Sequence, residues 1–155
     1  MMNDGYTESR EISAPAAAVW ATISDIARLP VVLSGMTALM IEGDDPTTRI
    51  GLAWTQTRVI AGRSGTERLE ITALDQGNRY VTRGGGHGID YVSTWEVEPI
   101  GPATSRLTCT FVGIPRTAFA RLLVRLFGRL GSGATREAMR TDLDDIAMAV
   151  EGAAR

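Results

Sequence analysis

One stretch decides the fold of this chain: residues 115–150, which read PRTAFARLLVRLFGRLGSGATREAMRTDLDDIAMAV. Its second half carries apolar residues at steps of four, three and four: Met139, Leu143, Ile146 and Val150. This spacing places them on one face of a helix. Its first half carries a second apolar stripe: Phe119, Leu122, Leu123, Leu126 and Leu130. A long amphipathic helix needs an apolar surface to cover its stripe, so we expect the preceding segments to supply one. The Gly-Ser-Gly at 131–133 either bends this helix or divides it in two.

The segments before this helix alternate between apolar and polar residues, which is typical of half-buried strands. Seven strands are predicted: 5–13, ending at Ile12, then 36–42, 50–60, 66–74, 79–83, 89–98 and 105–112. From the second strand onward the connections are short turns, so neighbouring strands run antiparallel. The alternation predicts these inward-facing residues: Leu52, Trp54, Gln56 and Arg58; Leu69, Ile71 and Ala73; Tyr91, Ser93, Trp95 and Val97; Leu107, Cys109 and Phe111.

Two short helices are expected between the first and second strands. The first runs to about Ser24 and buries Val19, Trp20 and Ile23. Asp25 can cap the second, which Pro30 limits. The order of elements predicts an α+β fold, in which a curved seven-stranded antiparallel sheet grips the long C-terminal helix.

Composition narrows the function classes. The 155 residues suit one domain spanning 1–155, and the net charge of −2 does not favour nucleic-acid binding. The chain has no lysine, which excludes a lysine Schiff base. With one cysteine and one histidine at unrelated positions we expect no metal site, and we expect no cofactor. The N-terminus does not resemble a signal peptide and no apolar run is long enough to span a membrane, so we expect a soluble, cytoplasmic protein.

Several short motifs resemble one known superfamily. The opening ISAPAAAVW at 12–20, followed by Ser24-Asp25 and Leu29-Pro30, is similar to the START-like (SRPBCC) polyketide cyclase, dehydrase and lipid-transport proteins. So are the stretches 55–58 and 62–67, and HG at 87–88 ahead of YVSTW at 91–95. The resemblance implies a helix-grip fold, as in the birch-pollen allergen group, with a cavity that binds a hydrophobic ligand. Where one bacterial branch commonly has Glu, this chain has Gln56.

Two residues could carry chemistry in such a cavity. His87 falls on the inward side if the alternation of the following strand extends back to it, where it could act as a general acid or base. The alternative is a loop histidine that faces solvent. Arg58 shares a strand face with Trp54 and could bind a ligand carboxylate or enolate. The alternative, which we favour, is that it pairs with Glu67 or Glu70 across the hairpin.

Other inward side chains would line the same space. The expected ligand-binding set is Trp54, Gln56, Arg58, His87, Tyr91, Ser93, Trp95 and Phe111. Aromatic residues on an apolar strand face usually belong to the core, but in a hollow fold they also form the pocket wall.

Three functions follow from these patterns. We favour binding or transport of a hydrophobic small molecule, such as a lipid or an aromatic polyketide. The second is a cyclase or dehydratase that uses His87 and Arg58, so we leave open whether the chain is an enzyme. The third is membrane-surface binding through residues 116–129, where Arg121, Arg125 and Arg129 recur every four residues. A solvated arginine face is the more common outcome of that pattern. The sequence leaves the oligomeric state open, a homodimer included.

Overall fold

A single antiparallel sheet forms the body of the protein. The computed structural model describes residues 5–86 and 88–153, with the backbone alone for 86, 123, 124 and 126–132. The strands are β1 Tyr6–Ile12, β2 Met36–Ile41, β3 Ala53–Ile60, β4 Arg63–Asp75, β5 Arg79–Gly86, β6 Ile89–Gly101 and β7 Thr104–Pro115. They lie in the order β1-β7-β6-β5-β4-β3-β2, with every neighbouring pair antiparallel. The predicted seven-stranded antiparallel sheet is confirmed.

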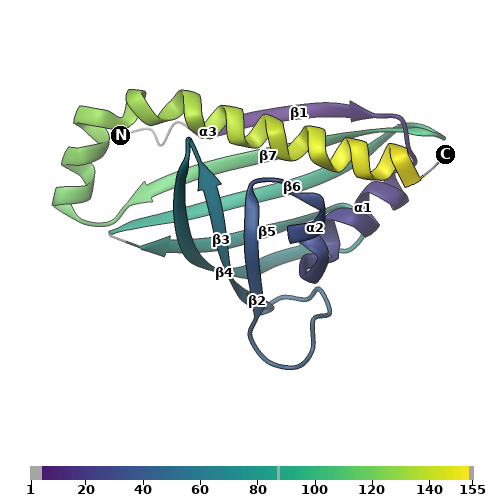
Figure 1. The fold of residues 1–155 in the computed structure, drawn as a ribbon, viewed down its shortest axis with the longest axis horizontal. Coiled ribbons are helices and arrows are strands. Elements are labelled where there is room, and N and C mark those ends of the chain that lie inside the picture. Colours follow the sequence, from purple (N-terminus) through teal and green to yellow (C-terminus); the bar gives the residue numbers. More distant parts are fainter. Residues whose placement is uncertain (1–4, 87, 154–155) are drawn as a thin grey trace.

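The helices follow the predicted order. After β1 come α1 Ala16–Ser24, a 3-10 turn η1 Ile26–Arg28 and α2 Leu29–Val32. Pro30 lies in the first turn of α2 rather than at the end of a helix, and Asp25 makes no capping hydrogen bond. The long helix, α3 Ala118–Ala153, is continuous, so the glycines at 131 and 133 do not divide it. Figure 1 shows its first turns at a steep angle to the remainder, which crosses the sheet.

The second half of α3 closes the sheet as its periodicity predicts. Its predicted stripe, Met139, Leu143, Ile146 and Val150, is buried. These side chains join one core with Ile12, Ile71 and Leu107 from the sheet and Val19, Trp20 and Ile23 from α1. The first half differs from the prediction, because Phe119 and Leu122 are 69% and 50% exposed. The first turns of α3 lie at a steep angle to the part that crosses the sheet (Figure 1), which agrees with the exposure of these two side chains.

Polar contacts fix α3 against both edges of the molecule. On β1, Glu8 accepts hydrogen bonds from Arg136 at 3.0 Å and Arg140 at 3.2 Å, and Arg10 pairs with Asp144. After α2, the backbone N–H and hydroxyl of Ser34 both donate to Asp145, at 2.8 and 2.7 Å. The helix is therefore held at its two flanks, while its middle faces the inner surface of β3 to β7.

The inward faces of the strands are those predicted, except on β4. A register shift between Ile71 and Ala73 marks a β-bulge. The predicted inward position at Ala73 is wrong, because after this extra residue Leu74 is the side chain that packs against the core.

Candidate ligand-binding cavity

A cavity of about 160 Å³ lies between the sheet and the middle of α3. Aliphatic residues from the short helices, β2, β3, β4 and α3 form much of its wall: Ile23, Leu29, Leu33, Met36, Ile60, Leu69, Ala138, Met139 and Ile146. The sheet places them there because every second residue of a strand faces inward. The lining is therefore mainly apolar, which suits an apolar ligand.

Aromatic side chains form the rest of the apolar wall. Tyr91 and Phe111, on neighbouring strands, are stacked with their ring centroids 5.3 Å apart and their planes 22° apart. Trp54 is buried, and Trp95 is half-buried beside the cavity. Tyr80 is buried at the α1 side, where its hydroxyl donates to the carbonyl of Ile23 at 2.9 Å.

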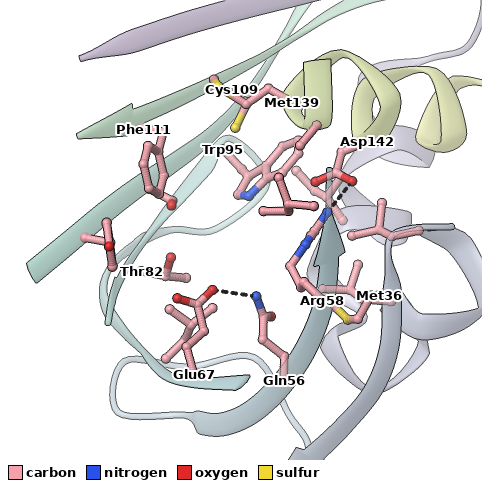
Figure 2. A pocket seen from close by; sticks show the side chains of 18 of the residues that line it. Met36, Gln56, Arg58, Glu67, Thr82, Trp95, Cys109, Phe111, Met139 and Asp142 are labelled. Carbon is pink, nitrogen blue, oxygen red and sulfur yellow. Dashed lines mark hydrogen bonds and ion pairs between the residues drawn. The ribbon is translucent and has the colours of Figure 1, made fainter. Parts of the chain in front are cut away.

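Three side chains form a hydrogen-bonded chain along one wall. Trp54 Nε1 donates to Gln56 Oε1 at 2.9 Å, and Gln56 Nε2 donates to Glu67 Oε1 at 3.1 Å. Gln56 and Glu67 are direct partners in the β3–β4 register, so both face inward. Figure 2 shows the two side chains pointing toward one another at the cavity. The carboxylate beside Gln56 therefore comes from the neighbouring strand.

A salt bridge also lies in the wall, two residues further along β3 from Gln56. Arg58 Nη2 lies 2.7 Å from Asp142 Oδ1 of α3, and the two side chains are only 15% and 9% exposed. Burial raises the pKa of Asp142 above its ordinary value, and the positive charge of Arg58 opposes that rise. The favoured expectation that Arg58 pairs with Glu67 or Glu70 is wrong, because its side chain reaches inward to the helix rather than across the hairpin.

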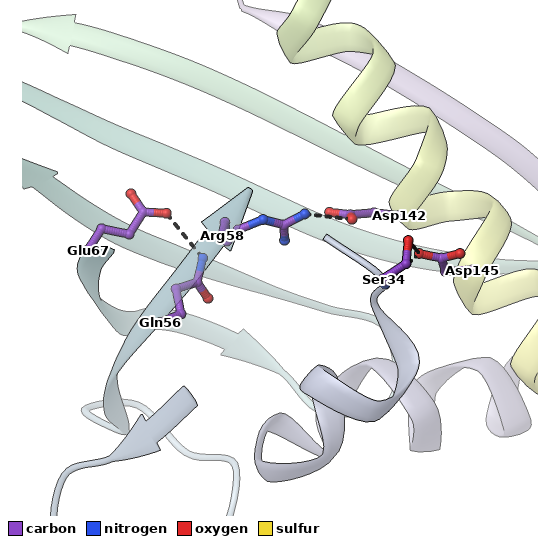
Figure 3. A network of polar contacts seen from close by, with 6 residues as sticks. All are labelled: Ser34, Gln56, Arg58, Glu67, Asp142 and Asp145. Carbon is purple, nitrogen blue, oxygen red and sulfur yellow. Dashed lines mark hydrogen bonds and ion pairs between the residues drawn. The ribbon is translucent and has the colours of Figure 1, made fainter. Parts of the chain in front are cut away.

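This salt bridge also lies between the cavity and the surface. A surface groove of about 370 Å³ is framed by the loop after α2, the end of β3 and α3. The groove and the cavity share four lining residues: Arg58, Ile60, Ala138 and Asp142. Figure 3 shows Arg58 between Asp142 and the Gln56–Glu67 pair, with the Ser34–Asp145 contact nearby.

Burial suppresses ionisation of the other polar groups in the wall. It raises the pKa of the Cys109 thiol to about 12 and the pKa of Tyr80 beyond the usual range of a phenol. The pKa of Tyr91 is also raised, first by burial and then by the negative charge of Glu67. At neutral pH these groups are neutral.

The cavity brings together seven of the eight expected ligand-binding residues: Trp54, Gln56, Arg58, Tyr91, Ser93, Trp95 and Phe111. His87 lies outside the described residues. The sequence analysis missed Glu67 and Asp142. The sequence spacing indicates both positions. Glu67 lies two residues before Leu69 and therefore faces the same side of its strand. Asp142 lies three residues after Met139 and four before Ile146, on the same face of the helix.

The part of the chain that the structure describes lacks two features. It contains no group of three or more His, Cys, Asp and Glu side chains arranged to hold a metal ion. Within the same residues, no helix is both long and apolar enough to cross a membrane.

Comparison with known families gives one match. The family model described as polyketide cyclase/dehydrase and lipid transport matches residues 5–151. No curated protein matches the chain.

Solved structures with this architecture are numerous. The Zhui aromatase/cyclase of a Streptomyces species superposes with a TM-score of 0.79 at 14% identity, covering 98% of this chain and 96% of that one. A START superfamily protein of Mycobacterium smegmatis gives 0.77 at 14% identity, covering 96% and 97%. Norcoclaurine synthase of Thalictrum flavum, in complex with dopamine and hydroxybenzaldehyde, gives 0.71 at 21% identity, covering 96% and 87%. At these identities the likeness concerns the fold, and the helix-grip arrangement is confirmed.

Proposed function

Because the chain belongs to the polyketide cyclase/dehydrase and lipid transport family, we propose that it binds a hydrophobic small molecule in the cavity between the sheet and α3. One observation carries this proposal: a partly open space of about 160 Å³ whose wall is mainly aliphatic and aromatic. An apolar ligand that enters it leaves water, which is favourable by about 25 cal/mol for each Å² of apolar surface buried. The residues proposed to contact it are Trp54, Gln56, Arg58, Tyr91, Ser93, Trp95 and Phe111, with His87 as a further candidate.

The size of the cavity restricts the ligand. An apolar cavity of about 150 Å³ is large enough to hold benzene. The space here is close to that size, so a compound with one aromatic ring fits without rearrangement. A fused polyketide or a long acyl chain would need α3 or the Arg58–Asp142 pair to move.

Native mass spectrometry after gentle purification tests the proposal. We expect a co-purified apolar compound, or a one-to-one complex when the protein is mixed with single-ring aromatic compounds. A protein that stays empty, and shows no response to a panel of aromatics and fatty acids, would contradict it.

A second candidate function is catalysis of the cyclase or dehydratase type. The guanidinium of Arg58 favours it, because it lines the cavity and has N–H groups beyond the one bonded to Asp142 that could donate to an enolate. His87 would move the proton. The test is turnover of polyketide-like substrates by the wild type and by His87→Ala. Equal rates in both would remove His87 from the mechanism.

Exposed apolar side chains favour a third candidate, contact with anionic membranes. Phe119 and Leu122 are exposed at the start of α3, next to the exposed Arg121 and Arg125. Co-sedimentation with anionic liposomes, weakened by salt, is the expected result. Binding that is indifferent to anionic lipid and to salt would contradict it.

A further inference from the structure

We infer that Glu67 forms a subsite for a protonated amine, so that the ligand is a single-ring aromatic compound with an ammonium group. This inference rests on the proposed binding function and adds the charge of the ligand to it. It follows from the charge balance of the cavity and from the hydrogen bonds that hold Glu67.

Among the described residues that line the cavity, Glu67 has no positively charged partner. Three of these residues have an acidic or a guanidinium side chain: Arg58, Glu67 and Asp142. Arg58 and Asp142 neutralise one another at 2.7 Å. Within the described part of the chain, Glu67 takes part in no salt bridge, and its hydrogen-bond partner is the neutral amide of Gln56. Among the described residues of the cavity wall, the carboxylate of Glu67 is therefore the charged group without a partner of opposite sign.

The hydrogen bonds fix how Glu67 presents that charge. Gln56 Oε1 accepts from Trp54 Nε1, so the NH₂ group of Gln56 is directed to Glu67 Oε1. No described side chain donates a hydrogen bond to Glu67 Oε2. Every fully buried polar side-chain atom of the described residues has a hydrogen-bond partner, so Oε2 is not fully buried. This second oxygen is therefore accessible and can accept a hydrogen bond from a molecule that reaches it. Figure 2 shows the carboxylate facing the space bordered by Trp95 and Phe111.

An ammonium group satisfies this arrangement better than a neutral or an acidic group. A half-buried carboxylate without a cation loses hydration that one amide does not replace. An ammonium donates a charge-assisted hydrogen bond, which is stronger than one from a hydroxyl. The stacked rings of Tyr91 and Phe111 add an aromatic surface that attracts a cation. A ligand carboxylate would be repelled by Glu67.

The experiment compares three probes with the same ring: 2-phenylethylamine, 2-phenylethanol and phenylacetate. Their affinities are measured by calorimetry at pH 7 and constant ionic strength. We expect the amine to bind about tenfold more tightly than the alcohol, and phenylacetate most weakly. The Glu67→Gln variant keeps the shape of the side chain and should bind amine and alcohol alike. Its binding of the alcohol also reports that it is folded.

The matched control is Glu70→Gln, on the same strand. Glu70 pairs with Arg68 at the surface and does not line the cavity, so this variant should keep the preference for the amine. Equal binding of amine and alcohol by the wild type would overturn the inference and leave the proposed function standing. A preference that survives Glu67→Gln would overturn it as well. If none of the three probes binds, this inference is overturned, and the panel of aromatics and fatty acids then decides the proposed function separately.

Discussion

Arg58 of β3 and Asp142 of α3 form a salt bridge of 2.7 Å between the sheet and the helix, at the wall that the interior cavity shares with the surface groove. The two residues are 84 positions apart in the sequence, so only the folded state brings them together. Each is the charge partner of the other in a mainly apolar setting. The stability of the fold around the cavity and the path into the cavity therefore depend on the same contact.

Removing one partner should destabilise the protein strongly. Asp142→Ala leaves the guanidinium of Arg58 buried without a counter-charge, which typically costs about 3–5 kcal/mol in the free energy of unfolding. Urea denaturation of the wild type and the variant measures it. The control is Asp144→Ala, which removes an exposed salt bridge with Arg10 and should cost no more than about 1 kcal/mol. Equal losses in the two variants would show that Arg58 finds water or another partner.

The contact between Glu8 and α3 should make stability depend on pH. The hydrogen bond from Arg136 is the largest cause that holds the pKa of Glu8 below its ordinary value of 4.5, with Arg140 adding to it. A carboxylate with a lowered pKa in the folded state stabilises that state fully above pH 4.5. The contribution is lost as the pH falls through the lowered pKa.

The variant Glu8→Gln tests this dependence. It should be less stable than the wild type at pH 7, and the difference in urea midpoint should decrease as the pH is lowered below 4.5, for example to pH 3. Glu137→Gln is the control, since Glu137 is exposed and takes part in no salt bridge among the described residues. A Glu8→Gln difference that is the same at both pH values would rule out this carboxylate as a source of acid sensitivity.

Cys109 should be unreactive in the folded protein although it lines the cavity. Because burial raises the pKa of its thiol to about 12, only about one molecule in ten thousand carries the reactive thiolate at pH 8. A disulfide reagent added at pH 8 should label the protein slowly without denaturant and rapidly in urea. Rapid labelling of the native protein would mean that the thiol is hydrated through the cavity.

The hydroxyl of Tyr80 should stabilise the fold where the cavity borders α1. Tyr80→Phe removes the donor to the Ile23 carbonyl, and an unsatisfied buried acceptor costs about 1–3 kcal/mol. Urea denaturation measures the loss. Tyr6→Phe keeps the ring over which Arg136 lies and should change stability by less than about 0.5 kcal/mol. A loss in Tyr80→Phe no larger than in this control would contradict the role of the hydroxyl.

Strand periodicity predicted most of the interior from the sequence. On β3, the alternation that placed Trp54, Gln56 and Arg58 inward is the one observed, because an antiparallel sheet with one covered face keeps a strict period of two. The alternation failed at Ala73, where a β-bulge inserts an extra residue. A bulge changes the parity of a strand without a distinctive residue pattern, so the sequence did not reveal it.

Partners across the molecule were harder to predict. Arg58 could have met Glu67 as a diagonal neighbour on the adjacent strand, although the direct partner of Glu67 is Gln56 and that of Arg58 is Gly65. Asp142 was overlooked because a charged residue in a helix is normally assigned to the solvent side. The exposure of Phe119 and Leu122 could not be predicted either, since the angle of the first turns of α3 depends on packing rather than on period.

The central claim is that the space between β3–β7 and α3 receives a ring-sized apolar ligand. The most direct measurement is anomalous diffraction from crystals of the protein soaked in iodobenzene. The account predicts an iodine peak inside the cavity, within contact distance of Trp95, Phe111 and Met139, while these side chains keep their positions. Iodine found only at the surface, or a cavity already filled by its own side chains, would contradict it.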